Sequence, residues 1–318
     1  MPEATRRLDL PDRYDFGGTV RQLPMGGHDP CLRIADGSFW WATRTPDGPA
    51  TLRLSRDGAQ LLATGYGPGR DWVLDRADGV AGLRDDVASF PSVAARHPVV
   101  KELAHRYAGF RLPALGVIFP RLLRAIFEQK VTGKEAYHAY AATVRHFHAA
   151  SGKEPAPGPL PLLLPPDPSA VAATPYWVFH RFGVEQRRAD TLARAAVAAP
   201  ALELCPDAAT ASARLQAVPG IGPWTAAEVA RVAYGDPDAV SVGDYHIPHM
   251  VAWNLAGQAR AGAREGAPGR LSPADERMLE LLEPFRGHRG RVTVLLELGG
   301  QGAPKFGPRM PIRSFAAY

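Results

Sequence analysis

The spacing of hydrophobic residues changes once along the chain, and the two patterns indicate different secondary structure. Between Cys31 and Tyr66, hydrophobic and polar residues alternate in short runs. Alternation with a period of two is typical of half-buried strands, and Asp-Gly pairs between such runs favour tight hairpin turns. These pairs stand at Asp36-Gly37, Asp47-Gly48 and Asp57-Gly58. We therefore expect a small antiparallel sheet with a helix packed on one face. Trp40 and Trp41 would point to opposite faces of the sheet, with one of them in the core.

From Pro98 onward the hydrophobic positions follow the helical period. Stripes with spacings of three and four residues indicate helices that bury one face. Two such stripes are Val99, Val100, Leu103, Ala104, Tyr107 and Leu122, Leu123, Ile126, Phe127. Further helices are expected at Tyr137–Ala150, Ser169–Ala173, Gln186–Ala198, Ala208–Val218, Trp224–Tyr234, Tyr245–Leu255, Asp275–Leu282 and Gly290–Leu298. The segment from Glu154 to Pro168 is rich in proline, which excludes a helical interior and predicts a long connecting loop.

Together the two patterns predict an α+β protein, mostly α-helical, preceded by a small antiparallel β-sheet domain. The chain has 318 residues, which is enough for two domains, because a domain commonly takes about 150 residues. We expect the sheet domain at residues 1–97, the helical domain at residues 98–300 and an extended C-terminal tail at residues 301–318.

Composition and charge narrow the class of protein. The net charge is +5 and the sequence pI is about 9.3, which favours a polyanionic partner, although excess arginine is also common on ordinary surfaces. The two cysteines, Cys31 and Cys205, cannot build a disulfide framework or a four-cysteine iron–sulfur cluster. The sequence has no signal-peptide pattern and no hydrophobic run of about 18 residues. We expect a soluble, cytoplasmic protein without a membrane partner.

One stretch, Leu215–Leu255, combines features that suit binding to a phosphate. Pro-Gly-Ile-Gly-Pro at residues 219–223 separates a helix that ends near Val218 from a helix that begins at Trp224. Proline suits the first position of a helix, and glycine suits a positive φ or a turn that a partner approaches closely. The unpaired N–H groups at the start of the second helix could bind a phosphate. A single carboxylate, Asp244, follows this helix in the apolar run at residues 240–247.

These residues resemble the helix-hairpin-helix-GPD superfamily of DNA glycosylases. The resemblance rests on Val-Pro-Gly-Ile-Gly-Pro-Trp-Thr-Ala at residues 218–226, followed by Gly-Asp-Tyr at residues 243–245. Within the superfamily the residues are most similar to the alkylation-repair branch, DNA-3-methyladenine glycosylase II, whose early core helix with its glutamine resembles Leu123–Val131. The resemblance covers residues 114–298. It implies that the helical domain is a helix-hairpin-helix glycosylase domain and that the sheet is an accessory layer.

The resemblance implies that Asp244 is the catalytic residue. Breaking an N-glycosidic bond builds positive charge on the deoxyribose, as in an oxocarbenium ion, and a nearby carboxylate can stabilise this charge and orient the attacking water. One carboxylate suffices when the leaving base is already cationic through alkylation. The alternative is that Asp244 only caps the helix that follows it, and both roles are compatible.

Trp224 stands where strand-nicking members of the superfamily carry a lysine nucleophile. Because tryptophan has no nucleophile, the resemblance implies a monofunctional glycosylase without lyase activity. Trp224 would line the base pocket, where an indole face attracts a cationic base, with Tyr245 and Glu228 beside it. The alternative for Trp224 is simple packing between helices.

The hairpin and the early core helix supply the expected DNA contacts. By resemblance, Gly220, Ile221 and Gly222 would present backbone N–H groups to a DNA phosphate, with Thr225 alongside, and the hairpin could hold a monovalent cation. No other cofactor and no metal site are expected, because His246, His249 and His288 do not form a metal constellation with the two distant cysteines. The alternative is an ordinary tight turn between two helices.

Gln129 and Lys130 stand where the family places residues that enter the minor groove and fill the gap left by a flipped nucleotide. Gln129 matches the family motif, whereas Lys130 departs from it, because an apolar residue is the better-known occupant. A lysine stem could fill part of the gap while its amine reaches a phosphate. Alternatively, Lys130 is a solvated helix residue.

Two departures leave the substrate open. Glu228 or a neighbour replaces an aromatic residue that the family often has there, and the last core helix, which contains Arg291-Val-Thr-Val-Leu-Leu-Glu, has no tryptophan. The pocket should therefore be less aromatic and could accept varied lesions. We expect a monomeric, nucleoid-associated DNA glycosylase that excises alkylated bases from damaged duplex DNA and so initiates base excision repair. The alternatives are a non-catalytic protein that binds DNA or DNA damage, and a strand-nicking glycosylase for oxidised bases, for which the lysine is missing.

Overall fold

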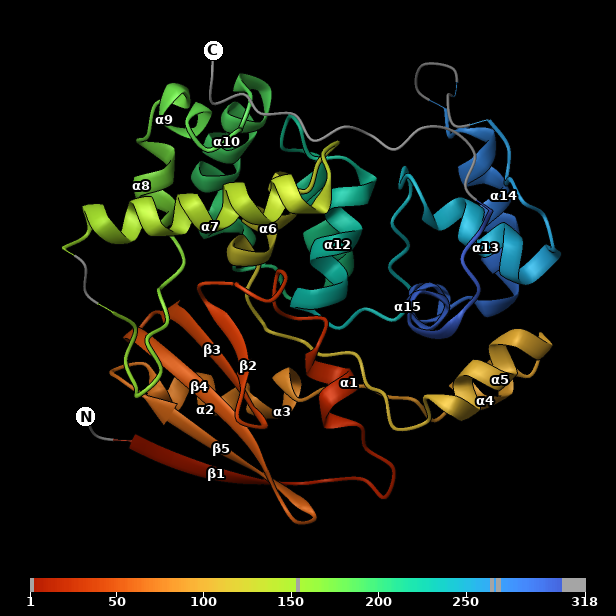
Figure 1. Ribbon diagram of the computed structural model, residues 1–318, viewed down its shortest axis with the longest axis horizontal. Helices are drawn as coiled ribbons and strands as arrows, with labels where there is room; N and C mark the ends of the chain where they lie inside the picture. The colour runs from red at the N-terminus through yellow and green to blue at the C-terminus, as the bar shows by residue number, and fades with distance from the viewer. Residues whose placement is uncertain (1–2, 153–154, 264–265, 267–269, 305–318) are drawn as a thin grey trace.

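The computed structural model describes residues 3–152, 155–263, 266 and 270–304. It is an α+β fold in which one antiparallel sheet lies beside a larger set of helices, as the sequence predicts (Figure 1). The segment expected to be a tail, residues 301–318, lies outside the described residues except for residues 301–304.

The sheet has five strands in the order β1-β5-β4-β3-β2, and all neighbouring strands are antiparallel. Its strands are β1 Glu3–Asp9, β2 Leu32–Ala35, β3 Ser38–Thr45, β4 Gly48–Asp57 and β5 Gln60–Tyr66. The expected meander is confirmed in β2–β5. Ala35 pairs with Ser38, so Asp36-Gly37 forms a two-residue turn with a positive φ at both residues, which is what an Asp-Gly hairpin turn requires.

The sheet buries side chains on both faces, although only one of the two tryptophans was expected in the core. Trp41 packs in the main hydrophobic cluster, whereas Trp40 stacks on Tyr66 and packs with Leu162 on the other face. Leu162 belongs to the proline-rich segment, whose course is fixed by a hydrogen bond from the N–H of Leu163 to the carbonyl of Pro30 at 2.9 Å. The expected connecting loop therefore also covers the sheet.

The helices of the second half follow the expected ranges closely. Those that build the site and its support are α6 Phe119–Phe127, α7 Gly133–Ala150, α8 Pro168–Ala172, α10 Gln186–Leu202, α11 Ala208–Gln216, α12 Pro223–Ala233, α13 Ile247–Ala256, α14 Pro273–Leu282 and α15 Arg289–Gly299. The N-terminal half adds α1 Phe16–Val20, α2 Arg70–Asp75, α3 Ala77–Val80, α4 Phe90–Ala94 and α5 Pro98–Arg106, and a further short helix is α9 Tyr176–His180. A 3₁₀ turn, Glu283–Phe285, links α14 to α15.

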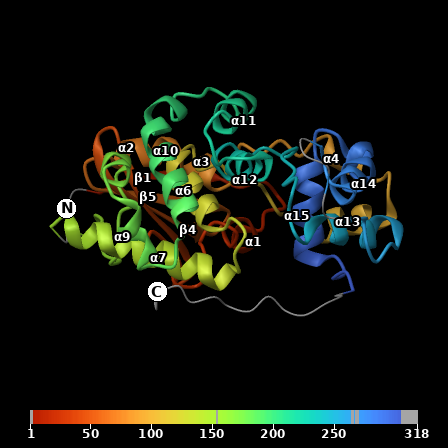
Figure 2. The ribbon, with the colours of Figure 1, turned by 90° about the horizontal axis from the view of Figure 1, so that it is seen from above.

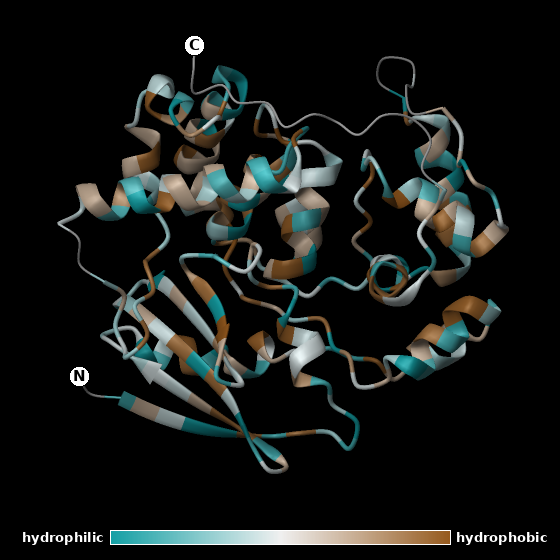
Figure 3. Ribbon diagram, viewed as in Figure 1, coloured by the Kyte–Doolittle hydropathy of each residue, from teal (hydrophilic) through white to brown (hydrophobic). Residues whose placement is uncertain are grey.

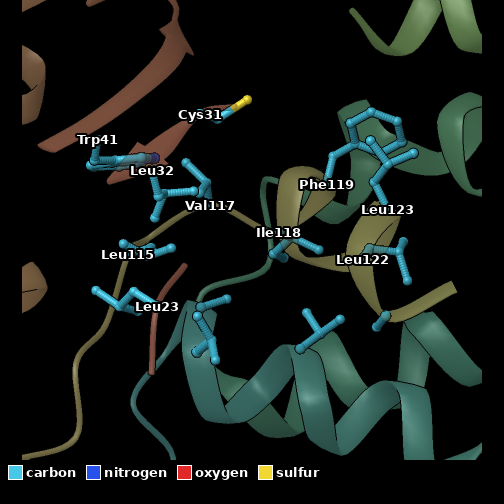
Figure 4. Close-up of a cluster of buried hydrophobic side chains, with 14 of the residues drawn as sticks. Leu23, Cys31, Leu32, Trp41, Leu115, Val117, Ile118, Phe119, Leu122 and Leu123 are labelled. Atoms are coloured by element: carbon cyan, nitrogen blue, oxygen red, sulfur yellow. The ribbon is translucent and has the colours of Figure 1, made fainter. Parts of the chain in front are cut away.

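The largest buried cluster joins the sheet to the helices. Figure 4 shows Trp41 of β3 on one side and Leu122 and Leu123 of α6 on the other, with Leu115 and Val117 of the connecting segment between them. The cluster continues into α7, α10, α11 and α12. The sheet and these helices therefore share one core.

A second buried cluster combines helices that are far apart in sequence. It joins Val100 and Leu103 of α5 to α13, α14 and α15, and Figure 3 shows α5 hydrophobic on the side toward those helices. The two clusters thus do not separate the elements at residue 97. The domain boundary expected there from the sequence stays a prediction. None of the helices among the described residues is long and apolar enough to cross a membrane.

The two groups of helices meet at α12. Figure 1 shows α15 end-on between α12 and the pair α13–α14, and Figure 2 shows the same neighbours from above. The segment between α12 and α13 connects the two groups, and Asp244 is on this segment.

Candidate active site

The hairpin between α11 and α12 needs glycine at one of its two glycine positions and leaves the other open. Gly220 has a φ of +99°, and a Cβ there would lie 2.2 Å from Oγ1 of Thr191 on α10. Gly222 precedes Pro223, which is the first residue of α12, and a Cβ on Gly222 would meet no atom within 4 Å. The fold thus requires the first glycine, whereas the space beside the second is free for a partner.

The expected DNA contact by the backbone of Ile221 is wrong. Its N–H donates to the carbonyl of Val218 at 3.0 Å, and its side chain packs in the main cluster. A turn this tight uses the central N–H to close itself. Among the hydrogen bonds of the described residues, none uses the N–H of Gly220 or Gly222, so these two groups suit a phosphate.

Gln129 connects the end of α6 to the hairpin. Its Nε2 donates to the carbonyl of Gly220 at 3.1 Å and to Oγ1 of Thr225 at 2.9 Å. Thr225 is only 2% exposed, so its side chain supports Gln129 from within and does not offer a direct DNA contact. The expectation for Thr225 is corrected accordingly: burial at the first turn of α12 turns it toward α6.

Lys130 is exposed directly after Gln129 and has a φ of +54°. Among the described residues, only Asp36 is another non-glycine residue with a positive φ, and it lies in the hairpin turn described above. The left-handed conformation costs a lysine about 1–2 kcal/mol. Strain of this kind persists where the surrounding structure enforces it, often at binding sites.

Asp244 is held by three N–H donors. Its Oδ1 accepts from the backbone N–H groups of His246 at 2.7 Å and Ile247 at 2.9 Å, and its Oδ2 accepts from Nε1 of Trp224 at 3.0 Å. The first two bonds cap the start of α13, so the capping role is present. A carboxylate can accept about four hydrogen bonds, which leaves Asp244, itself half-buried, with capacity for a further contact.

Two further hydrogen bonds hold the residues just before Asp244. Before it, Oγ of Ser241 donates to Oε1 of Glu228 at 2.6 Å, and the N–H of Gly243 donates to Oδ1 of Asp275 at 2.8 Å. Trp224 is partly buried against the main cluster. The indole N–H therefore meets a carboxylate whose position is set independently by α12 and α14.

Glu228 lies behind the site, which corrects its expected place in the pocket wall. Its carboxylate is paired with Arg121 and, at 2.7 Å, with Arg231. Burial opposes ionisation, but the two guanidinium groups and the hydroxyl of Ser241 overcome it and lower the pKa of Glu228 to about 2. A charge this well paired is satisfied inside the protein, so it positions the neighbouring loop and does not face a base.

Tyr245 is half exposed, and its ring packs edge-on against His246 with centroids 4.7 Å apart. It follows Asp244 directly, so its ring borders the site. Its role as a pocket residue stays a prediction.

The sequence interpretation missed Glu297 on α15. Burial raises the pKa of this carboxyl to about 7; the charge of Arg231 opposes the shift, and those of Glu228 and Asp244 add to it. The signal available in the sequence is one acidic residue that ends the apolar run Val292–Leu296. Among the described residues, no group of three histidine, cysteine, aspartate or glutamate side chains could hold a metal ion.

Comparisons with known proteins show which solved structures have a similar fold. No family model matches the sequence, and no curated protein matches it. Among solved structures, the 3-methyladenine DNA-glycosylase from Archaeoglobus fulgidus aligns with a TM-score of 0.72 at 16% identity, over 92% of this chain and 96% of that chain. MBOgg1 in complex with a low-affinity DNA ligand aligns with a TM-score of 0.65 at 15% identity, over 93% and 97%. A Clostridium acetobutylicum 8-oxoguanine glycosylase/lyase bound to double-stranded DNA aligns with a TM-score of 0.63 at 13% identity, over 89% and 90%.

These likenesses confirm the fold that the resemblance implies. Two of the three structures are glycosylases by name, the third is bound to a DNA ligand, and this chain shares the fold of all three over nearly its whole length. The alignments also cover 90% or more of each of those proteins.

Proposed function

We propose that this protein is a monofunctional DNA glycosylase that binds duplex DNA, takes a damaged nucleotide out of the stack and hydrolyses its N-glycosidic bond. The observation that carries the proposal is the carboxylate of Asp244, held by the indole N–H of Trp224 and the start of α13 on the segment that follows the hairpin. Two of the structures with this fold contain DNA, which supports DNA as the partner.

The hairpin would hold the DNA backbone. The N–H groups of Gly220 and Gly222 suit a phosphate, and the open space beside Gly222 allows its close approach. Lys130 would enter the duplex beside the flipped nucleotide, with its aliphatic stem in the gap and its amine toward a phosphate. The hydrogen bonds of Gln129 to Gly220 and Thr225 tie this loop to the hairpin, so both contacts would move as one unit.

Asp244 would stabilise the positive charge that develops on the sugar as the base leaves, and it would accept a proton from the attacking water. Trp224 and the backbone donors keep the carboxylate in one orientation, which avoids reorganisation during the reaction. Trp224 stands where a lyase would need an amine, so the product would be an intact abasic site. The preference for alkylated bases is part of the proposal, supported by the 3-methyladenine DNA-glycosylase from Archaeoglobus fulgidus with the same fold.

The proposal is tested with duplex oligonucleotides that carry 3-methyladenine, 7-methylguanine, hypoxanthine or 8-oxoguanine at one position. Each is incubated with the protein and then divided, and one half is heated in alkali to cut abasic sites. We expect alkali-dependent cleavage of the alkylated duplexes. Cleavage without alkali would show a lyase, and DNA binding without any cleavage would show a non-catalytic protein.

A further inference from the structure

Asp244 is the last residue of a tight turn that begins at Ser241. The N–H of Asp244 donates to the carbonyl of Ser241 at 3.2 Å, and Gly243, at the third position of the turn, has a φ of +91°. A positive φ suits glycine, which has no Cβ to clash with the backbone. The N–H of Gly243 donates to an acceptor outside the turn, Oδ1 of Asp275 on α14, at 2.8 Å. A side chain from a different helix therefore holds the residue directly before Asp244.

Asp275 also belongs to the start of α14. It is only 6% exposed. Its Oδ2 accepts from the hydroxyl of Ser272 at 2.6 Å, and its own N–H donates to the same hydroxyl oxygen at 3.1 Å. Ser272 is the N-cap residue of α14. The two oxygens of the carboxylate thus have separate partners: Oδ2 binds the helix cap, and Oδ1 binds the turn at Gly243.

The hydrogen bonds of Asp275 are not accompanied by an ion pair. Among the salt bridges of the described residues, none includes Asp275. A carboxylate that is buried without a cation is costly unless hydrogen-bond donors satisfy it, and here the donors are a backbone N–H and a hydroxyl. What Asp275 supplies to the turn is therefore an acceptor at a fixed point, and not the balance of a positive charge.

Two helices from different hydrophobic clusters hold the turn. On one side, the hydroxyl of Ser241 donates to Glu228 of α12, which packs in the main cluster. On the other side, Gly243 is bonded to Asp275 of α14, which packs in the second cluster. Without the bond to Asp275, the peptide before Gly243 could rotate while Ser241 stays in place. The carboxylate of Asp244 would then shift relative to the start of α12.

We infer that Asp275 is a positioning residue for excision: by holding the N–H of Gly243, it keeps the carboxylate of Asp244 where positive charge develops on the sugar. The inference rests on the proposed function, and Asp275 acts only through Asp244. A charged group stabilises a transition state best when it is oriented beforehand, and a displacement of about 1 Å can lower a rate by roughly 100-fold. Asp275 should therefore affect the rate of bond breakage and not the affinity for DNA.

The test separates the two partners of Asp275. Asp275→Ala removes both bonds of the carboxylate, and we expect the single-turnover rate of 7-methylguanine excision to fall by about 10–100-fold at saturating protein. Its affinity for a duplex with a tetrahydrofuran in place of the damaged nucleoside should stay that of wild type. Ser272→Ala is the matched control, because it weakens the same helix start but leaves the acceptor for Gly243; it should excise at close to the wild-type rate. Asp275→Asn keeps an oxygen acceptor and should retain most of the rate.

A double-mutant cycle distinguishes positioning from a general loss of stability. If Asp275 acts through Asp244, Asp275→Ala should lower excision much less in an Asp244→Asn protein than in wild type, because the charge that the turn positions is already gone. A residue that only stabilises the fold would lower both rates by the same factor. Urea unfolding should show similar losses of stability for Asp275→Ala and Ser272→Ala.

The outcomes for the inference and for the proposed function differ. Equal factors in the two backgrounds, or excision by Asp275→Ala at the rate of Ser272→Ala, overturn the inference and leave the proposed function standing. If Asp275→Ala does not fold, Asp275→Ser takes its place in the same comparison, because serine can still lie in the first turn of α14 but is too short to reach Gly243. A wild type that excises no damaged base overturns both.

Discussion

The indole N–H of Trp224 donates to the carboxylate of Asp244 at 3.0 Å, across twenty positions of sequence. This bond joins the first turn of α12 to the loop before α13. It places the two residues that the sequence singles out for chemistry in direct contact. The bond would also direct the carboxylate, since the other oxygen is held by the backbone of α13.

Replacing Asp244 by asparagine should reduce excision of 7-methylguanine at least ~100-fold, because the amide cannot balance the charge on the sugar. Asparagine still caps a helix, so binding to undamaged duplex should change little. Single-turnover cleavage and fluorescence anisotropy measure the two effects. Asp207→Asn, at the exposed cap of α11, is the control, and equal excision by Asp244→Asn and Asp207→Asn would contradict the role of Asp244.

Replacing Trp224 by phenylalanine keeps an aromatic ring but removes the hydrogen bond to Asp244. A hydrogen bond to a charged group contributes about 1.5–3 kcal/mol, so we expect a loss of excision of about tenfold or more. Trp177→Phe, on the exposed surface of α9, should have no effect. If Trp224→Phe excises at the wild-type rate, the indole N–H does not direct the carboxylate.

The two glycines of the hairpin should respond differently to alanine. Gly220→Ala places a Cβ against Thr191 at a positive φ, so the free energy of unfolding should fall by about 1–3 kcal/mol. Gly222→Ala meets no protein atom, so the fold should be kept while the affinity for duplex DNA falls. Urea unfolding and anisotropy at fixed salt distinguish them. If Gly222→Ala and wild type bind duplex DNA with the same affinity, no DNA phosphate is bound at Gly222.

Glu228→Gln should destabilise the protein by about 3–5 kcal/mol at pH 7, since it leaves Arg231 without its ion-pair partner and Arg121 with only the longer contact to Glu128 at 3.6 Å. The folded pKa of Glu228, about 2, lies below its ordinary value of 4.5. Its contribution to stability is therefore present above pH 4.5 and is lost as the pH falls toward 2. Between pH 4.5 and 2, the free energy of unfolding measured with urea should fall more steeply for wild type than for Glu228→Gln. If the two proteins show the same pH dependence, the ion pair does not contribute to stability.

Lys130→Gly should raise stability by up to about 1 kcal/mol, because glycine accepts the positive φ that strains lysine. Lys130→Ala is the matched variant, since it also lacks the stem and the charge but keeps the strain. Both should excise more slowly than wild type if Lys130 enters the duplex. A Lys130→Ala protein that is as stable as Lys130→Gly would show that the backbone relaxes without cost.

The periodic parts of the fold could be predicted from the sequence, because their information is local. The helices from Gln186 onward and the Asp-Gly hairpins follow from spacing and turn chemistry. Strand β1 was not predicted, because it is an edge strand whose residues are mostly exposed and its hydrophobic alternation is therefore weak. The short helices α1–α4 and α9 have too few turns to show a period.

The site was only partly predictable, because its contacts depend on distance in space. Asp244 and Trp224 could be chosen from their motif, but the hydrogen bond between them could not. The burial of Thr225, the internal use of the Ile221 N–H and the ion pairs of Glu228 all depend on what the rest of the chain brings beside them. Glu297 was not singled out because nothing near it in the sequence indicates that charged groups from other elements surround it.

The second hydrophobic cluster has a consequence for synthesis. Helices α4 and α5 bury apolar side chains in a cluster with α13–α15, and α13 leaves the ribosome about 140 residues after α5. At roughly 5–20 residues per second this takes on the order of ten seconds. During that interval an apolar surface is left uncovered, a natural target for a chaperone, and the loop that carries Asp244 lacks its contact with Asp275 until the chain is almost complete.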